Sequence, residues 1–197
     1  MKKNTLRERR EEERRQKRIK TLLIIGGAVL VISILGGYLF WRENRPLPGE
    51  SVPVMANALE HVAAGEDPGP FNSNPPSSGR HYAQPMEAGF YEEDDPAAQA
   101  PHPEGYILHS LEHGYVVFWY NCQVLEEQDC TALKSQIKDV MGDFQNFKVI
   151  GFPWSEMDAP AALTSWGRIQ TFETFDPDQA RKFVRANRYQ APEPNAP

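Results

Sequence analysis

The sequence has only two cysteines in 197 residues, Cys122 and Cys130. Seven residues separate them, so the chain lacks both the C-x-x-C pair of a thiol redox centre and the cysteine set of a structural zinc site. This spacing favours a short loop closed by a disulfide, which forms in an oxidising compartment. Two separate buried thiols are the alternative interpretation.

Residues 21–40 contain no charged side chain at all. At about 1.5 Å per residue, a helix of this length spans about 30 Å, the hydrocarbon thickness of a bilayer. The preceding 20 residues carry ten Lys or Arg against four Glu. This bias predicts a basic cytoplasmic tail over residues 1–20, a transmembrane signal anchor over residues 21–41 and an extracytoplasmic remainder. A cleaved signal peptide or a lipoprotein signal is disfavoured, because neither an A-x-A-like site nor a cysteine follows the apolar run.

Basic residues are scarce after the apolar run. The chain has 21 Lys and Arg against 27 Asp and Glu, and removing those of the first 20 residues leaves 11 basic and 23 acidic side chains. A part of the protein with about −12 net charge lacks the basic footprint that nucleic-acid binding requires. The expected partners are therefore the membrane, through one helix, and a protein of the cell envelope.

Several functional patterns are missing. The sequence shows no Ser/His/Asp or Cys/His arrangement around a recognisable nucleophile, no glycine loop that could cradle a phosphate and no internal repeat. These absences disfavour nucleophilic hydrolases, nucleotide-binding enzymes and solenoids. A non-catalytic role is therefore favoured over an enzymatic one.

Proline and glycine divide the remainder of the chain. Residues 42–56 are proline-rich and aperiodic, which predicts an extended stalk. An α+β domain is expected over residues 57–190, with a disordered tail over residues 191–197. Within the domain, residues 65–80 are too rich in Pro, Gly, Ser and Asn for a helix, and a loop of this length is often functional. A second breaker-rich stretch, residues 92–105, is expected on the surface.

Regular structure is expected from Tyr106 onward. Residues 115–120 (YVVFWY) are β-branched or aromatic at both parities, which predicts a central strand covered on two faces. Asp176-Pro177 predicts a helix start with an aspartate cap. The remaining elements predicted by periodicity are a short strand at 59–62, a helix at 131–144, a strand at 147–152 and a strand at 163–172 with a bulge at Gly167. The resulting β-α-β-β-α order predicts a small mixed or antiparallel sheet packed with two helices, an α+β fold.

The sharpest local signal is His109-Ser-Leu-Glu112-His113. Read as H-x-x-E-H, it matches a zinc-protease motif in which a helix presents both histidines. Gly114 and the strand formers after it argue for a strand instead, which would place both imidazoles on one side and Glu112 on the other. Glu112 would then orient a ring from outside the ligand set or form an ion pair elsewhere, for example with Arg80.

Other metal-ligand candidates lie elsewhere in the chain. His61 and His81 are further imidazoles, and Met86 follows His81 by five residues. Imidazole with thioether suits copper, whereas imidazole with carboxylate suits zinc. His102 lies between two prolines in an acidic loop and is expected to be exposed to solvent. Each histidine can equally be a hydrogen-bonded structural residue, and Met86 a filler of the core.

Four segments together resemble a bacterial family. They are residues 74–82 (NPPSSGRHY), 89–91 (GFY), 109–117 (HSLEHGYVV) and 165–167 (SWG). The combination is similar to the bacterial domain-of-unknown-function family 3105, over about residues 59–189. His61-Val62 also falls where the family has a His-Val pair, whereas Arg80 replaces a proline that is common there. Members have a basic cytoplasmic tail, one anchor and an exported domain, so the resemblance implies the same plan here without implying a reaction.

The resemblance also places four histidines and Glu112 in one pattern. It implies a transition-metal site, copper ahead of zinc, formed by His81, His109 and His113 with His61 or Met86 completing the shell and Glu112 outside it. The alternative is a cell-envelope interaction module in which the histidines tie the proline-rich loop of residues 65–80, the proline loop, by hydrogen bonds. A third reading, an enzyme with Glu112 as general base beside a bound metal, is less favoured.

Overall fold

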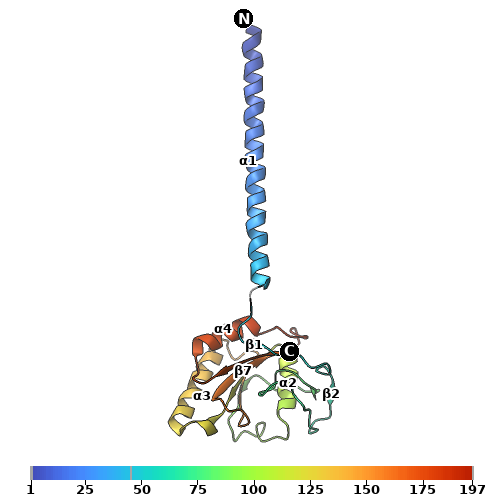
Figure 1. The fold of residues 1–197 in the computed structure, drawn as a ribbon, viewed down its shortest axis with the longest axis vertical. Coiled ribbons are helices and arrows are strands. Elements are labelled where there is room, and N and C mark those ends of the chain that lie inside the picture. The colour runs from blue at the N-terminus through green and yellow to red at the C-terminus, as the bar shows by residue number, and fades with distance from the viewer. Residues whose placement is uncertain (1, 45, 197) are drawn as a thin grey trace. The chain divides into compact units, whose positions relative to one another are not determined.

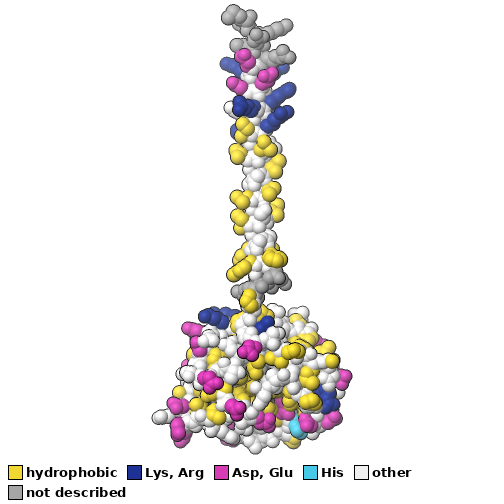
Figure 2. Space-filling view, in the orientation of Figure 1, with side chains coloured by type: hydrophobic (Ala, Val, Ile, Leu, Met, Phe, Trp, Pro, Cys, Tyr) yellow, Lys and Arg dark blue, Asp and Glu magenta, His cyan; other side chains and the backbone are white. Residues whose placement is uncertain are grey.

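The computed structural model describes residues 2–44 and 46–196. The chain forms two compact units, Met1–Pro46 and Leu47–Pro197, which we describe separately. The first unit is one long helix, α1 (Lys2–Asn44). Its segment Glu8–Trp41 is long and apolar enough to cross a membrane, and Figure 2 shows basic side chains beyond one end of the apolar band. A signal sequence shares these properties.

The second unit is a mixed sheet covered by helices on both faces (Figure 1). The order of its six strands is β1-β8-β7-β5-β6-β4, and β2 and β3 form a separate pair. The expected α+β fold is confirmed. The strands are β1 (Glu50–Ser51), β2 (His61–Val62), β3 (His81–Tyr82), β4 (Gly89–Phe90), β5 (Val116–Tyr120), β6 (Val149–Pro153), β7 (Ala161–Ser165) and β8 (Arg168–Phe172). The helices are α2 (Glu104–Glu112), α3 (Glu127–Gly142) and α4 (Pro177–Asn187), with a 3-10 turn η1 (Cys122–Val124).

Strand β5 is central, as its sequence predicts. It pairs in parallel with β6 and antiparallel with β7, and all five of its residues are buried. Val116 and Phe118 belong to the core cluster that includes α3 and α4, whereas Val117 and Trp119 belong to the cluster that includes α2. The alternation of side chains along one strand therefore joins two cores, and it places α2 on the opposite face of the sheet from α3 and α4.

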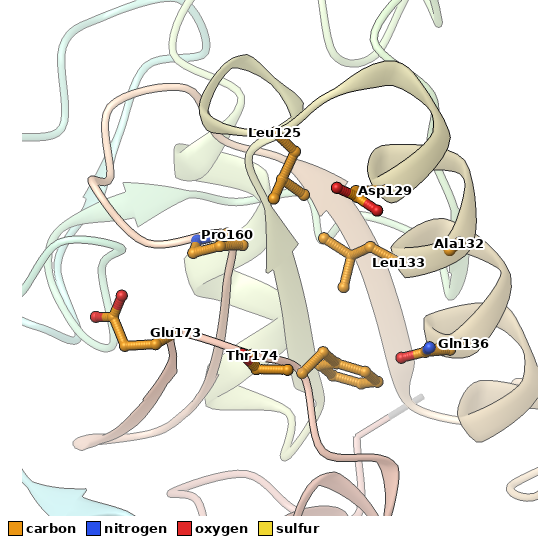
Figure 3. Close-up of a pocket in the computed structure, with 9 residues that line it drawn as sticks. Leu125, Asp129, Ala132, Leu133, Gln136, Pro160, Glu173 and Thr174 are labelled. Carbon is orange, nitrogen blue, oxygen red and sulfur yellow. The ribbon is translucent and has the colours of Figure 1, made fainter.

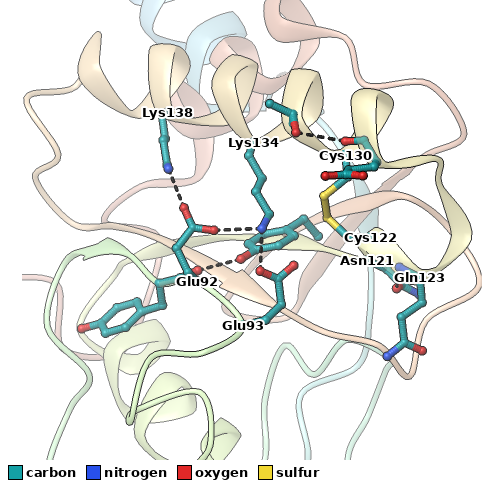
Figure 4. The surroundings of a disulfide bond; sticks show 12 residues. Glu92, Glu93, Asn121, Cys122, Gln123, Cys130, Lys134 and Lys138 are labelled. Atoms are coloured by element: carbon teal, nitrogen blue, oxygen red, sulfur yellow. Dashed lines mark hydrogen bonds and ion pairs between the residues drawn. A yellow bond between two sulfur atoms is a disulfide. The ribbon is translucent and has the colours of Figure 1, made fainter.

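The disulfide between Cys122 and Cys130 is confirmed, with Cα atoms 5.2 Å apart. It joins η1 to the first turn of α3 at the end of the central strand (Figure 4). Close by, Lys134 of α3 pairs with Glu92 and Glu93. The bond therefore fixes the connection between β5 and α3 on the face that α2 does not cover.

Two predictions about strands and helices are wrong in detail. Residues 163–172 are not one bulged strand, because β7 and β8 form an antiparallel hairpin that turns at Gly167, where φ is +65°. Residues 109–113 are not a strand, because His109 and Glu112 lie in α2 and His113 caps its C-terminal end. The helix at Asp176 begins as predicted, since the aspartate side chain accepts the backbone N–H groups of Asp178 and Gln179.

The ends of the domain are also more ordered than expected. The predicted stalk over residues 42–56 is wrong from Leu47 onward, because β1 pairs with β8 and Arg168 donates hydrogen bonds to Leu47 O and Gly49 O. The predicted disordered tail packs on the domain, where Lys148 Nζ donates to Pro194 O at 3.0 Å and to Ala196 O at 2.6 Å. Residue 197 lies outside the described part of the chain.

Candidate metal centre

The two-residue pair of β2 and β3 brings the first two histidines together. The strands are parallel, and His61 lies opposite His81 in their register. The ring centroids of the two imidazoles are 4.9 Å apart. His81 is fully buried, whereas His61 is exposed, so this strand pair carries one ligand candidate in the interior and one at the surface.

Helix α2 supplies the other two side chains. His109 and Glu112 are three residues apart and therefore lie on the same face of the helix. Both are buried, with relative exposures of 7% and 6%. The helix lies so close to β3 that a Cβ atom at Gly105 would be 2.6 Å from the ring of Tyr82. Only glycine fits at that contact, and the close approach holds His109 beside the strand pair.

The four side chains converge. Each of His61, His81, His109 and Glu112 offers one ligand atom, and these atoms all lie within 4.8 Å of one another. The three imidazole centroids form a near-equilateral triangle with sides of 4.9, 5.2 and 5.1 Å. Ring nitrogens about 2.0 to 2.1 Å from a tetrahedral zinc ion place neighbouring imidazole centroids about 5 Å apart. The triangle therefore has the dimensions of a three-histidine site.

Backbone carbonyl groups select the tautomers of the two buried rings. His81 Nδ1 lies 3.0 Å from Gly79 O, and His109 Nδ1 lies 2.7 Å from Tyr82 O. A carbonyl only accepts hydrogen bonds, so both Nδ1 atoms carry a proton and donate it. Each neutral ring then presents an unprotonated Nε2. Metal-bound histidines commonly donate their other N–H to a backbone carbonyl in this way.

The electrostatics of the site favour neutral imidazole at His109. Burial lowers the pKa of the His109 ring, the hydrogen bond with Tyr82 opposes that change, and the nearby His113 and His81 lower the pKa further. The ring therefore stays unprotonated at a lower pH than an exposed histidine would. The neutral ring keeps a lone pair on Nε2, which lies 3.0 Å from His113 Nε2 and accepts a hydrogen bond from that ring when no ion is bound.

The proline loop holds His81 in place. Asn72 Oδ1 accepts the backbone N–H groups of Ser77 and Ser78, at 3.2 and 2.9 Å. Further along the loop, Asn74 accepts a hydrogen bond from the Trp154 indole at 2.7 Å. These hydrogen bonds fix the segment that leads into β3. The loop residues therefore position His81 and are not ligand candidates themselves.

The remaining candidates lie outside the group of four. His113 Nε2 is 3.0 Å from His109 Nε2 and 3.7 Å from Glu193 Oε2, so it contacts the site from the C-terminal end of α2. Met86 is buried in the apolar cluster with Ile107 and Leu108, which is the role of a core filler.

The contacts also test the predicted exposure of His102 and the predicted partner of Glu112. His102 is partly exposed, with its Nδ1 3.4 Å from Glu104 Oε1. Glu112 Oε2 lies 3.0 Å from His81 Nε2, whereas Arg80 pairs with Glu66 at 3.8 Å. The suggested pair between Glu112 and Arg80 is therefore wrong.

The histidine group lies away from the hollow shown in Figure 3. That cavity, of about 330 Å³, lies between α3 and the segment before α4, and Leu125, Leu133 and Phe175 are among its lining residues. No histidine is among its lining residues within the described chain. The histidine group and this cavity are therefore separate features of the domain.

The comparisons with known proteins agree with the motifs. A family model described as protein of unknown function (DUF3105) matches residues 61–197. The chain belongs to this family. The match begins at His61 and includes every residue of the histidine group. No curated protein and no solved structure matches the chain.

Two features of the site were missed by sequence reasoning. The first is the inclusion of Glu112 among the converging side chains in place of His113. The second is the pair of carbonyl groups, Gly79 O and Tyr82 O, that set the tautomers. A helical reading of residues 109–113 would have found the first, because residues three apart share a helix face. No side-chain pattern in the sequence predicts the two carbonyl groups.

Proposed function

We propose that this protein binds one divalent transition-metal ion through His61, His81, His109 and Glu112. The observation that carries the proposal is the pair of buried rings whose Nδ1 protons are donated to Gly79 O and Tyr82 O. Both side chains lie in one group with a carboxylate and a third imidazole, and His81 Nε2 lies 3.0 Å from the carboxylate of Glu112. Such a convergence of lone pairs costs free energy unless a cation or a proton occupies it.

The donor set favours zinc. Three imidazoles and one carboxylate are nitrogen and oxygen donors, which zinc accepts in tetrahedral geometry. Copper would gain from a soft sulfur ligand, but the thioether of Met86 packs in the apolar core. Residues from β2, β3 and α2 would hold the zinc ion. Glu112 would bind the ion directly rather than orient a histidine ligand.

We propose that α1 anchors this domain outside the cytoplasm. The basic excess in residues 1–20 and the charge-free run that follows support a cytoplasmic N-terminus. The disulfide supports an oxidising location for the domain. A reporter that functions only outside the cytoplasm should be active when fused after Pro197. Activity of a reporter that functions only in the cytoplasm, fused at the same place, would contradict this orientation.

The metal proposal is tested on the full chain in detergent. After loading with zinc and removal of the excess by gel filtration, elemental analysis should give one zinc per chain. His81→Ala should lose it, because this ring is fully buried in the group. His102→Ala is the matched control, since His102 lies outside the group, and should retain one equivalent. Equal zinc content in all three proteins would refute the assignment and favour the interaction module.

A further inference from the structure

His61 differs from the other three members of the group. The side chains of His81, His109 and Glu112 are buried, whereas His61 is exposed. An ion in this site would therefore face protein on the side of three ligands and solvent on the side of one. Any incoming ligand has to approach from the side of His61.

His61 also has the weakest support. His81 and His109 are each held by a hydrogen bond to a carbonyl oxygen. The ring of His61 makes no hydrogen bond to any residue that the structure describes, and it contacts the rings of His81 and His109, with centroids at 4.9 and 5.2 Å. Its rotation away from the group would break no hydrogen bond of the protein.

The backbone at His61 is also held by few contacts. Strand β2 has only two residues and pairs with β3 alone in the described chain. Glu60, directly before it, is exposed, and a turn follows in which Glu66 N–H donates to Ala63 O. By contrast, β3 packs tightly against α2 at Gly105. Short segments with few buried contacts open at low free-energy cost.

We propose that His61 is the exchange ligand of the site, through which the protein passes its metal ion to another donor. In the exchange, the bond between the metal and His61 breaks and a bond to an incoming nitrogen or sulfur donor forms, with no change of oxidation state. His81, His109 and Glu112 keep the ion until the new donor is bound. This inference rests on the proposed metal binding, and it makes the site one of transfer rather than permanent storage.

The incoming donor is expected to be a histidine or a thiolate of a partner protein. Both are the usual ligands of zinc and of related ions, and both are small enough to reach an ion through the space that one imidazole leaves. Exposed carboxylates at Glu60 and Glu66 lie in the same surface segment and repel an anionic thiolate, so the neutral imidazole is the favoured donor of the two.

Exchange kinetics test the proposal. The zinc-loaded full chain in detergent is mixed in a stopped-flow instrument with the chromogenic chelator pyridylazoresorcinol at rising concentrations. If the chelator enters at His61, the observed rate increases linearly with its concentration. A rate that is independent of chelator concentration would overturn the proposal, because the ion would then leave before the chelator arrives.

Two variants sharpen the result. His61→Ala, which removes one ligand, should bind zinc more weakly and release it to the chelator about tenfold faster, a change of about 1.4 kcal/mol in the barrier. His81→Ala also removes one imidazole, but a buried one, and should hold no zinc. Complete loss of zinc in His61→Ala would overturn the exchange role while leaving the metal site intact. Absence of zinc from the unaltered protein would instead refute metal binding itself, and the exchange role with it.

Discussion

His81 Nε2 lies 3.0 Å from Glu112 Oε2 across a buried contact. Because His81 Nδ1 keeps its proton and donates a hydrogen bond to Gly79 O, a neutral His81 ring would face Glu112 with a lone pair. Two acceptors at this distance require a proton or a metal ion between them. A tetrahedral zinc ion would place two of its ligand atoms about 3.3 Å apart, so the observed separation needs little adjustment on metal binding.

His113 should be dispensable for metal binding. Its Nε2 touches His109 Nε2 but it does not belong to the group of four. We expect His113→Ala to retain one equivalent of zinc, whereas His109→Ala loses it. Elemental analysis of both variants after gel filtration measures the difference. If His113→Ala loses zinc and a variant at Glu112, Glu112→Gln, retains it, then the histidine rather than the carboxylate is the fourth ligand.

The metal-free protein should lose stability in mild acid. The pKa of His109 is lowered in the folded state by burial, whereas the unfolded chain has the ordinary value of about 6.5. Below that pH the unfolded state binds more protons, so the free energy of unfolding falls as the pH decreases from about 7 to 5. Urea titrations followed by tryptophan fluorescence measure this change.

A matched pair of variants isolates that pH effect. His109→Asn keeps a side-chain donor for Tyr82 O but cannot take up a proton in this range, so it should flatten the dependence. His102→Asn, at a partly exposed position, should leave it unchanged. The lowered pKa of Glu92 acts at more acidic pH and does not interfere. The same pH dependence in His109→Asn as in the unaltered protein would contradict this contribution of His109.

The disulfide should stabilise the domain without affecting the metal. Closing a loop of this size contributes about 2 to 3 kcal/mol, so the double variant Cys122→Ser and Cys130→Ser should unfold at a correspondingly lower urea concentration. Its zinc content should equal that of the unaltered protein, because the bond joins η1 and α3 on the face opposite α2. Reduction of the unaltered protein should reproduce the loss, and unchanged stability on reduction would argue against it.

The C-terminal tail should depend on Lys148. The buried Nζ donates to His113 O at 2.8 Å as well as to the two carbonyl groups of the tail. Lys148→Met leaves these acceptors without their donor, at a cost of about 1 to 3 kcal/mol. Hydrogen exchange should then increase at the amide of Glu193, which donates to Glu112 O. Lys182→Met, at an exposed position in α4, is the control and should show no such increase.

The sequence predicted those elements whose local chemistry is unambiguous. A strand apolar at both parities has to be covered on two faces, and β5 is. Asp176 followed by proline has the chemistry of a helix start, and α4 begins there. The cysteine spacing predicted the disulfide for the same reason. In each case a few adjacent residues decide the structure, and distant contacts only add to it.

The wrong prediction for residues 109–113 arises where one glycine decides between two structures. Gly114, with φ of +82°, follows the C-terminal cap of α2, and a glycine there is a helix stop. The strand predicted for residues 109–113 instead treats this glycine as part of the strand that follows. That reading reversed the side of Glu112, because residues three apart share a face on a helix and oppose each other on a strand. The predicted orientation of Glu112, away from His109, is wrong for this reason.

The arrangement of His61 opposite His81 depends on contacts that no local pattern encodes. The two residues are brought together by a two-residue parallel pair and by the packing of α2 against β3. Only the resemblance to the family suggested that the separate histidines form one pattern. The structure adds the distances, the tautomers and the carboxylate, which are what an ion would recognise.

X-ray absorption at the zinc edge of the zinc-loaded full chain tests the central claim most directly. The account predicts four nitrogen or oxygen neighbours at about 2.0 to 2.2 Å, with the multiple-scattering signature of three imidazoles and no sulfur. In His61→Ala the imidazole count should fall to two. A spectrum of water ligands only, a sulfur neighbour, or an imidazole count unchanged by that substitution would contradict the site described.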